Sequence, residues 1–288
     1  MVFLFNIFYQ FGDSLAFLLL AAIGLAVIFG MMKIINLAHG EFITVGAYGT
    51  VVSGKVFNLP LPIAMAFGVI VTIIFGLILE KYIIRYLYGR PLDSVVATWG
   101  ISLIVSQSFL VIFGPSYEGL QTPMGNFQLG EFSYSEYRIF LIFFALFLLF
   151  LLYYLFMKTS FGTLARATIE NPSISSSMGV DVKNIYTTTF AIGAGLAGVT
   201  GALYAPTMTI VPSIGQAFIV SAFITVVTAG ASPFVGLVPA AAFLGTVQTS
   251  VTFFYKSTFG LIAILCAVIL IIRYLPNGFS GLILKKSK

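Results

Sequence analysis

The sequence predicts an all-α integral membrane protein: a bundle of about eight transmembrane helices, give or take one, with interrupted or re-entrant segments. Of its 288 residues, 59% are hydrophobic and only 8% are charged, and the mean hydropathy is +1.08. Soluble domains carry about 25% charged residues, so a water-soluble fold of this length could not cover its exterior. We therefore expect residues 1–288 to form a single transmembrane domain, with lipid as the solvent for most of its surface.

Apolar segments that could span a membrane recur along the whole chain. They cover 14–32, 37–54, 60–80, 94–113, 138–157, 185–206, 217–232, 234–254 and 258–275. A spanning helix needs about 20 residues, so the short segments 37–54 and 217–232 could stop part-way or re-enter. No basic region precedes the first apolar run and no small-residue cleavage site follows it. We expect that run to be retained rather than removed as a signal peptide.

Charged residues predict which loops face the cytoplasm. The basic residues gather as Lys81, Arg85 and Arg90, then Lys158, Arg166 and Lys183, and finally Arg273, Lys285, Lys286 and Lys288, whereas 114–138 holds Glu118, Glu131 and Glu136 against one arginine. The positive-inside rule places the three basic regions, including the C-terminus, in the cytoplasm and 114–138 outside. If all three segments before residue 81 span, the N-terminus lies outside. No basic face remains for a nucleic acid.

Two segments interrupt the hydropathy pattern in the same way. Within 31–49 a helix is expected to stop at 33–36 and another to begin at 39–41; within 193–223 a helix ends at Pro206 before the next one begins. Interrupted segments in corresponding parts of a transporter point to a solute site near the bilayer midplane, and ordinary turns at the membrane surface are the alternative. Glycines 24, 30, 193, 195, 198 and 201 are expected to let helix backbones approach closely.

The polar loop 158–184 is predicted to form two short helices. Residues 163–170 have helical character, Asn171 with Pro172 can begin a second helix, Gly179 can end it, and Asp181 can cap the next span. The loop has too few apolar residues for a core of its own. We expect it to dock on another protein, and a well-capped connection is the alternative.

Mostly neutral residues form the candidate solute path. They are Asn36, His39, Glu41, Thr98, Trp99, Gln107, Gln216, Ser221 and Thr225. Hydrogen-bonding groups without fixed charge suit a neutral or zwitterionic solute, whereas an ion-driven carrier generally needs carboxylates deep in its bundle. Glu41 is interpreted either as a favourable charge in a first helical turn or as a solute or gating residue. For His39, a structural role at the membrane boundary is the alternative to binding solute. For Trp99, an anchor at the membrane interface is the alternative to lining the path.

Catalytic and cofactor-binding patterns are missing from the sequence. One histidine and one cysteine leave little material for a metal cluster or a histidine-based relay. The chain has no P-loop for nucleotide phosphates. We therefore expect no enzyme activity and no cofactor, and energy from a nucleotide would have to reach the chain through a partner.

Several of these segments resemble a known family. The run GLAVIFGMMKIINLAHGEFITVGAY (24–48) is similar to the hallmark of the permeases of branched-chain amino acid type ABC importers, and 166–206 is similar to the coupling loop and following helix of that family. Residues 87–107 and 212–227 look most similar to its urea-import branch. The resemblance covers nearly the whole chain, although TAGASPFVG (228–236) departs from the glycine-rich stretch expected there.

The resemblance implies a type II-like importer permease of the bacterial plasma (inner) membrane that takes up urea or short-chain amides. Its implied partners are a second permease subunit, homologous or identical, two cytoplasmic ATP-binding subunits and an extracytoplasmic solute-binding protein. The loop 158–184 becomes the coupling loop on this basis. Its matching positions are Arg166, Glu170, Asn171 and Gly179.

Other functions stay open at this point. The same machine could carry leucine, isoleucine and valine, whose path would have to tolerate an apolar side chain and stabilise a zwitterion. A stand-alone channel or ion-coupled carrier for a small polar solute belongs to a different class and would need no ATPase. A membrane enzyme would need clustered histidines, cysteines or carboxylates, which the sequence does not contain.

Overall fold

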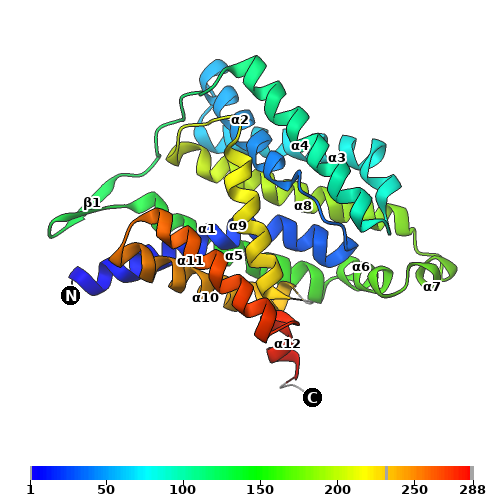
Figure 1. The fold of residues 1–288 in the computed structure, drawn as a ribbon. Helices are drawn as coiled ribbons and strands as arrows, with labels where there is room; N and C mark the ends of the chain where they lie inside the picture. The colour runs from blue at the N-terminus through cyan, green and yellow to red at the C-terminus, as the bar shows by residue number, and fades with distance from the viewer. Residues whose placement is uncertain (1, 231–232, 286–288) are drawn as a thin grey trace. The chain divides into compact units, whose positions relative to one another are not determined.

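The computed structural model describes residues 2–230 and 233–285, and within them the chain is almost entirely helical, which confirms the predicted all-α class. The helices are α1 (Val2–Met32), α2 (His39–Val56), α3 (Leu61–Tyr82), α4 (Pro91–Phe113), α5 (Glu136–Lys158), α6 (Ser160–Glu170), α7 (Pro172–Ser177), α8 (Val182–Tyr204), α9 (Ile214–Ala229), α10 (Pro233–Phe254), α11 (Ser257–Tyr274) and α12 (Gly278–Lys285) (Figure 1). Two short 3-10 helices, η1 (Ile84–Leu87) and η2 (Ala205–Thr207), connect them. Lys286 and Lys288 of the basic C-terminus, and residues 231–232 of the segment 228–236, lie outside the described residues.

Six of the described helices are long and apolar enough to cross a membrane. They are Val2–Met32, Leu61–Tyr82, Pro91–Phe113, Glu136–Lys158, Val182–Thr207 and Val235–Phe254. Two shorter apolar helices, Ile214–Ala229 and Thr258–Tyr274, would bring the number to the predicted eight. However, α9 has 16 residues and rises about 24 Å at the usual 1.5 Å per residue, less than a hydrocarbon core of about 30 Å. The number of full crossings therefore stays a prediction.

The first helix begins twelve residues earlier than the predicted span at 14–32, because its polar side chains find partners inside the fold. Gln10 Nε2 donates to Asn6 Oδ1, one turn away, at 3.1 Å. Asp13 pairs with Arg138 on α5. Tyr9 OH donates to Ser135 O at 3.2 Å and accepts from Ser135 N at 3.0 Å. Polar residues that would be unfavourable in a lipid-facing helix can therefore be part of α1.

The chain divides into two compact units, each built from separate stretches of sequence. Unit 1 comprises 1–22, 122–148 and 221–288, and unit 2 comprises 23–121 and 149–220. In unit 2, α2, α3 and α8 pack against one another and form the centre (Figure 1). In unit 1, α10 packs against α11 and α12. The single transmembrane domain inferred from the sequence stays a prediction.

The acidic stretch 114–138 contains a β-hairpin that the sequence did not predict. Strand β1 (Asn126–Leu129) pairs antiparallel with β2 (Phe132–Ser135), with Asn126 opposite Ser135. Four-residue strands are too short to show a clear alternation of apolar and polar residues, which is why no strand was expected. In unit 1 the hairpin is held to α1 by the paired hydrogen bonds between Tyr9 and Ser135.

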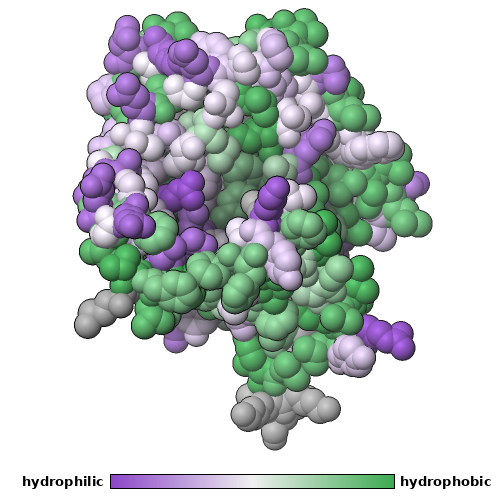
Figure 2. All heavy atoms as spheres, turned by 60° about the vertical axis from the view of Figure 1, so that its left-hand side comes forward, coloured by the Kyte–Doolittle hydropathy of each residue, from purple (hydrophilic) through white to green (hydrophobic). Residues whose placement is uncertain are grey.

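The described surface is dominated by apolar side chains, as expected of a protein in lipid. Figure 2 shows hydrophobic residues over broad areas, with the hydrophilic ones gathered in clusters. Large apolar residues are exposed along the lengths of α3, α4, α5 and α11, among them Ile70, Val111, Phe143 and Ile269. Such faces are stable only against lipid or a partner protein.

Glycines bring the central helices of unit 2 into backbone contact, as predicted for Gly24, Gly193 and Gly198. A Cβ atom added to Gly24 of α1 would lie 2.5 Å from Gly193 O of α8, and one added to Gly46 of α2 would lie 2.5 Å from Gly198 O. In lipid the hydrophobic effect does not drive helices together, so close van der Waals packing has to do so. These contacts hold α8 against both α1 and α2.

Replacing Gly46 by alanine is therefore expected to destabilise the protein by about 1–3 kcal/mol, because the new methyl group overpacks α2 against α8. Gly100→Ala is the matched control: it also lies inside a helix, but an added Cβ there has nothing within 4 Å. It should be neutral or stabilise by up to about 1 kcal/mol through helix propensity. Thermal unfolding of both purified variants in detergent measures the difference. Equal melting temperatures would contradict the close contact.

Candidate functional site

The predicted break near residues 33–36 is present in unit 2. Helix α1 ends at Met32 and α2 begins at His39, and Lys33 has a positive φ of 52°. The exposed turn is capped from inside the protein: Asn36 Oδ1 accepts from Ala38 N at 3.0 Å, and Thr98 Oγ1 of α4 accepts from Leu37 N at 3.0 Å. A helix break that is shielded from water is stable only where its backbone groups are satisfied in this way.

A stripe of small hydroxyl residues on α4 faces the break. Its members are Ser94, Thr98, Ser102 and Ser106, all buried, and each is four positions after the previous one. A spacing of four places them on one side of the helix. Ser94 and Thr98 satisfy their hydroxyls on carbonyls of α4 itself, at 2.7 Å and 2.6 Å. Ser102 instead donates to Glu41 Oε1 of α2 at 2.8 Å. We call these four residues the hydroxyl stripe.

Glu41 and Asn36 each keep one buried polar atom without a hydrogen bond. Glu41 is 1% exposed and Asn36 is 0% exposed. Within the described residues, Glu41 Oε2 and Asn36 Nδ2 have no hydrogen-bond partner. An unsatisfied buried polar atom costs about 1–3 kcal/mol, so such a pair is retained where it serves a purpose. The break therefore presents one acceptor and one donor close to each other in sequence.

The second predicted break meets the first. Helix α8 ends at Tyr204, η2 follows, and α9 restarts at Ile214. A Cβ atom added to Gly215 would lie 2.5 Å from Gly40 C and 2.7 Å from Thr44 Oγ1, so the first turns of α2 and α9 touch. Each helix carries a partial positive charge at its N-terminus. In transporters built from broken helices, such ends point towards anionic groups of the solute.

The structure groups four of the nine predicted path residues around the first break: Asn36, His39, Glu41 and Thr98. His39 is buried and its ring meets that of Phe42 edge to face. Trp99 is 59% exposed, and Gln107 and Gln216 are exposed as well. Ser221 and Thr225 are buried on the part of α9 that belongs to unit 1.

Ser94, Ser102 and Ser106 were missed by the sequence analysis. Hydroxyl residues recurring every four positions in an otherwise apolar helix were the signal that could have revealed them. As for metals, no group of three or more histidine, cysteine or carboxylate residues is close enough to hold an ion in the part of the chain that the structure describes.

The loop 158–184 has the two predicted helices. Helix α6 begins at Ser160 rather than 163, because Thr159 caps it by accepting from Gly162 N at 3.2 Å. Asn171 caps α7 through Ile174 N at 3.0 Å, and Asp181 caps α8 through Asn184 N at 3.0 Å. Gly179 has a φ of +85°, which favours glycine at the end of α7.

The same loop presents apolar and charged side chains to its surroundings. Ile174 is 58% exposed and Met178 is 80% exposed. Arg166 and Glu170 are exposed too, and Arg166 Nε donates to Gly162 O at 3.3 Å. An apolar patch on a short, fully capped helical element is typical of a docking surface.

Comparison with known proteins identifies relatives over nearly the whole chain. The family described as "Branched-chain amino acid transport system / permease component" matches residues 5–273. A probable branched-chain amino acid transport permease protein LivH from Methanocaldococcus jannaschii is 29% identical over 94% of this chain and 90% of its own length. The high-affinity branched-chain amino acid transport system permease proteins BraD from Pseudomonas aeruginosa and LivH from Escherichia coli are 27% and 23% identical over 91% of this chain, and over 91% and 90% of their own lengths. No solved structure gives a significant match.

The contact between Ser102 and Glu41 predicts an energetic coupling between the two residues. In a double-mutant cycle, Ser102→Ala and Glu41→Gln should couple by about 0.5–3 kcal/mol in unfolding free energy. Ser108→Ala is the matched control, because its exposed hydroxyl bonds only to Ile104 O of the same helix. Its cycle with Glu41→Gln should give a coupling near zero. Equal couplings in the two cycles, measured by unfolding in detergent, would refute the interaction.

Proposed function

The chain belongs to the family of permease components of branched-chain amino acid transport systems, and on this basis we propose that it is the membrane-spanning subunit of an ATP-driven importer for leucine, isoleucine and valine. The chain is a multi-pass transport permease rather than an enzyme. Its proposed location is the bacterial plasma (inner) membrane, with the C-terminus in the cytoplasm.

The observation that carries the proposed solute is the chemistry of the first break. A branched-chain amino acid brings an ammonium group, a carboxylate and an apolar side chain. The buried Glu41 Oε2 suits the ammonium, and Asn36 Nδ2 suits the carboxylate. The N-termini of α2 and α9 add favourable potential for a negative group. This complementarity to a zwitterion supports an amino acid as the solute.

Urea or a short amide is the solute predicted from the similarity of residues 87–107 and 212–227 to the urea-import branch. The comparisons give that substrate no support, since the three relatives named above are all described as branched-chain amino acid permeases. A neutral solute would also offer no counter-charge to an ionised Glu41 carboxylate. We therefore place urea second.

The proposed partners follow from the membership in an importer family. We propose a second permease subunit, homologous or identical, two cytoplasmic ATP-binding subunits and an extracytoplasmic solute-binding protein. Two exposed apolar residues, Ile174 in α7 and Met178 directly after it, support docking of the ATP-binding subunit on the loop 158–184. Arg166, Glu170, Asn171 and Gly179 remain the proposed coupling positions.

Uptake measurements on the complete transporter test the solute. Cells or proteoliposomes carrying all subunits should accumulate labelled leucine in an ATP-dependent manner and should not accumulate labelled urea. Glu41→Gln should reduce leucine uptake by about tenfold or more, because a buried charge contact is worth roughly 1.5–3 kcal/mol. Ser108→Ala is the control and should transport normally.

Two outcomes would contradict this proposal. Urea uptake without leucine uptake would reverse the order of the two solutes. Leucine flux through the purified chain alone in liposomes, without ATP, would favour a stand-alone channel or carrier over an importer subunit.

The docking proposal predicts that a new negative charge weakens the association with the ATP-binding subunit when it is placed on α7 but not when it is placed at the end of α2. Ile174→Asp should weaken the association with the ATP-binding subunit by about tenfold, because an exposed apolar anchor of an interface becomes a solvated charge. Val56→Asp is the matched control: Val56 is 59% exposed, like Ile174 at 58%, but lies at the end of α2 on the predicted outer side. Co-purification of the ATP-binding subunit measures both. Equal retention in both variants would argue against docking at α7.

A further inference from the structure

A partly buried ion pair between Glu80 of α3 and Arg85 of η1 is hydrogen-bonded to α8 next to the loop 158–184. Glu80 lies in the last turn of α3, and its side chain is 0% exposed. It accepts three hydrogen bonds, from Arg85 Nε at 3.2 Å, Arg85 Nη2 at 2.9 Å and Tyr88 OH at 2.7 Å. Arg85 Nη2 also donates to Thr187 Oγ1 of α8 at 3.3 Å. We call Glu80, Arg85, Tyr88 and Thr187 the clasp.

Stability alone does not explain the clasp. Glu80 is fully buried whereas the Arg85 side chain is 24% exposed, and taking a carboxylate out of water costs several kcal/mol, so the attraction of its partner is largely offset. Burial, and then the bond to Glu80, raise the pKa of Tyr88, so its phenol keeps its proton and donates throughout the neutral range. The hydrogen bonds that Arg85 donates to Glu80 likewise raise the pKa of Arg85. Such a fully bonded network specifies one arrangement of its members.

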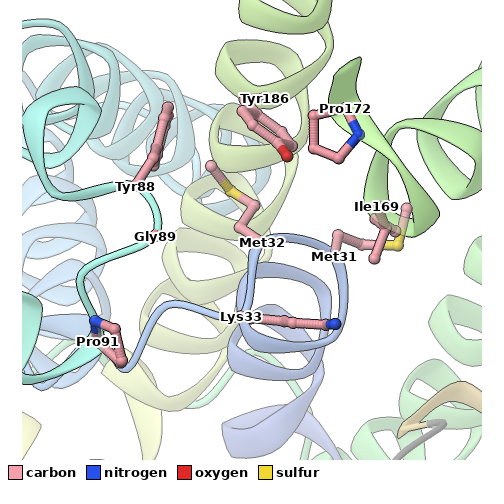
Figure 3. Close-up of a pocket in the computed structure, with 9 residues that line it drawn as sticks. All are labelled: Met31, Met32, Lys33, Tyr88, Gly89, Pro91, Ile169, Pro172 and Tyr186. Atoms are coloured by element: carbon pink, nitrogen blue, oxygen red, sulfur yellow. The ribbon is translucent and has the colours of Figure 1, made fainter. Parts of the chain in front are cut away.

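The clasp fixes the position of a pair of tyrosine rings. Tyr88 meets Tyr186 of α8 with ring centroids 5.0 Å apart and planes at 68°. Both rings line two cavities of about 530 Å³ each. The first also contains Met31, Met32 and Lys33 from the end of α1, and Ile169 and Pro172 from α6 and α7 (Figure 3). The second contains Ser176 and Val180 from the end of the loop.

The two cavities open to the surface, and they leave space between the loop and the firmly held ring pair. Space of this size beside α6 and α7 allows the helices to shift without forcing side chains into one another. The ring pair cannot follow easily, because Tyr88 is bonded to Glu80 and the start of α8 is bonded to Arg85 through Thr187. A loop movement that closes this space would therefore bring α6 and α7 against the ring pair and push on it.

We propose that Glu80 and Arg85 are positioning residues for coupled transport, holding Tyr88 and Tyr186 as the fixed support through which movement of the loop 158–184 reaches α8. This inference rests on the proposed function. From α8 the movement has a rigid route to the break, because the backbone contacts of Gly193 with Gly24 and of Gly198 with Gly46 leave no slack between α8, α1 and α2. The clasp residues need not touch the solute or the nucleotide.

Arg85→Lys in the complete, reconstituted importer tests the proposal. Lysine keeps the charge but cannot reproduce the two-pronged bond to Glu80 together with the bond to Thr187. We expect the amount of leucine transported per ATP hydrolysed to fall by about fivefold or more, the range of ordinary allosteric coupling, while ATP hydrolysis continues. Arg90→Lys is the matched control, because Arg90 pairs with Asp93 at 2.8 Å and both side chains of this ion pair are exposed. It should leave the ratio unchanged.

An unchanged ratio in Arg85→Lys, including the case in which transport and hydrolysis fall in the same proportion, would overturn the inference and leave the clasp a structural element. Tyr88→Phe removes a single hydroxyl and is the second variant if Arg85→Lys fails to assemble. It should also lower the ratio, and an unchanged ratio there would equally overturn the inference. Wild-type complex that transports no leucine would instead refute the proposed function, and the inference would fall with it.

Discussion

The requirement that every buried backbone polar group be satisfied inside the protein governs this structure. Interrupting a helix between Met32 and His39 exposes amide groups that lipid cannot bind. Asn36 and Thr98 accept from two of them, and both are completely buried. Of the hydroxyl stripe on α4, Thr98 supplies one of these two acceptors and Ser102 donates to Glu41. Capping of the backbone and placement of Glu41 thus depend on the same face of α4.

Close backbone contact is the second consequence of a lipid environment. Without water to drive helices together, glycine allows α8 to touch both α1 and α2, and it also lets the first turns of α2 and α9 meet at Gly40 and Gly215. Helices packed so tightly cannot slide independently. A displacement of the start of α8 would then also move α1 and α2, the helices on either side of the break. This would allow a permease to transmit a movement at its surface to the break.

The parts of the fold predicted from sequence are those set by local patterns. Hydropathy identified the helical segments, and the caps at Asn171 and Asp181 were predictable because each is encoded by two or three adjacent residues. The helix before residue 14 was missed because Asp13 and Tyr9 find partners on α5 and β2, far away in sequence. The candidate site was only partly predictable for the same reason: Asn36 and Thr98 lie in conspicuous motifs, whereas Ser102 acquires its role from Glu41, 61 residues away.

The solute assignment shows what such contacts add to a resemblance. The similarity of residues 87–107 and 212–227 to the urea-import branch suggested a neutral amide, whereas the mostly uncharged candidate path residues suited a neutral or a zwitterionic solute alike. Glu41 is the acidic residue among the candidate path residues, and its burial makes it more important for the choice of solute. Glu41 at a solvated helix start would need no partner, but it is enclosed and accepts one hydrogen bond from Ser102, so its ionised form would need a counter-charge. The ammonium group of an amino acid would supply that counter-charge when the solute binds and would leave with the solute on transport. A neutral solute has no such group.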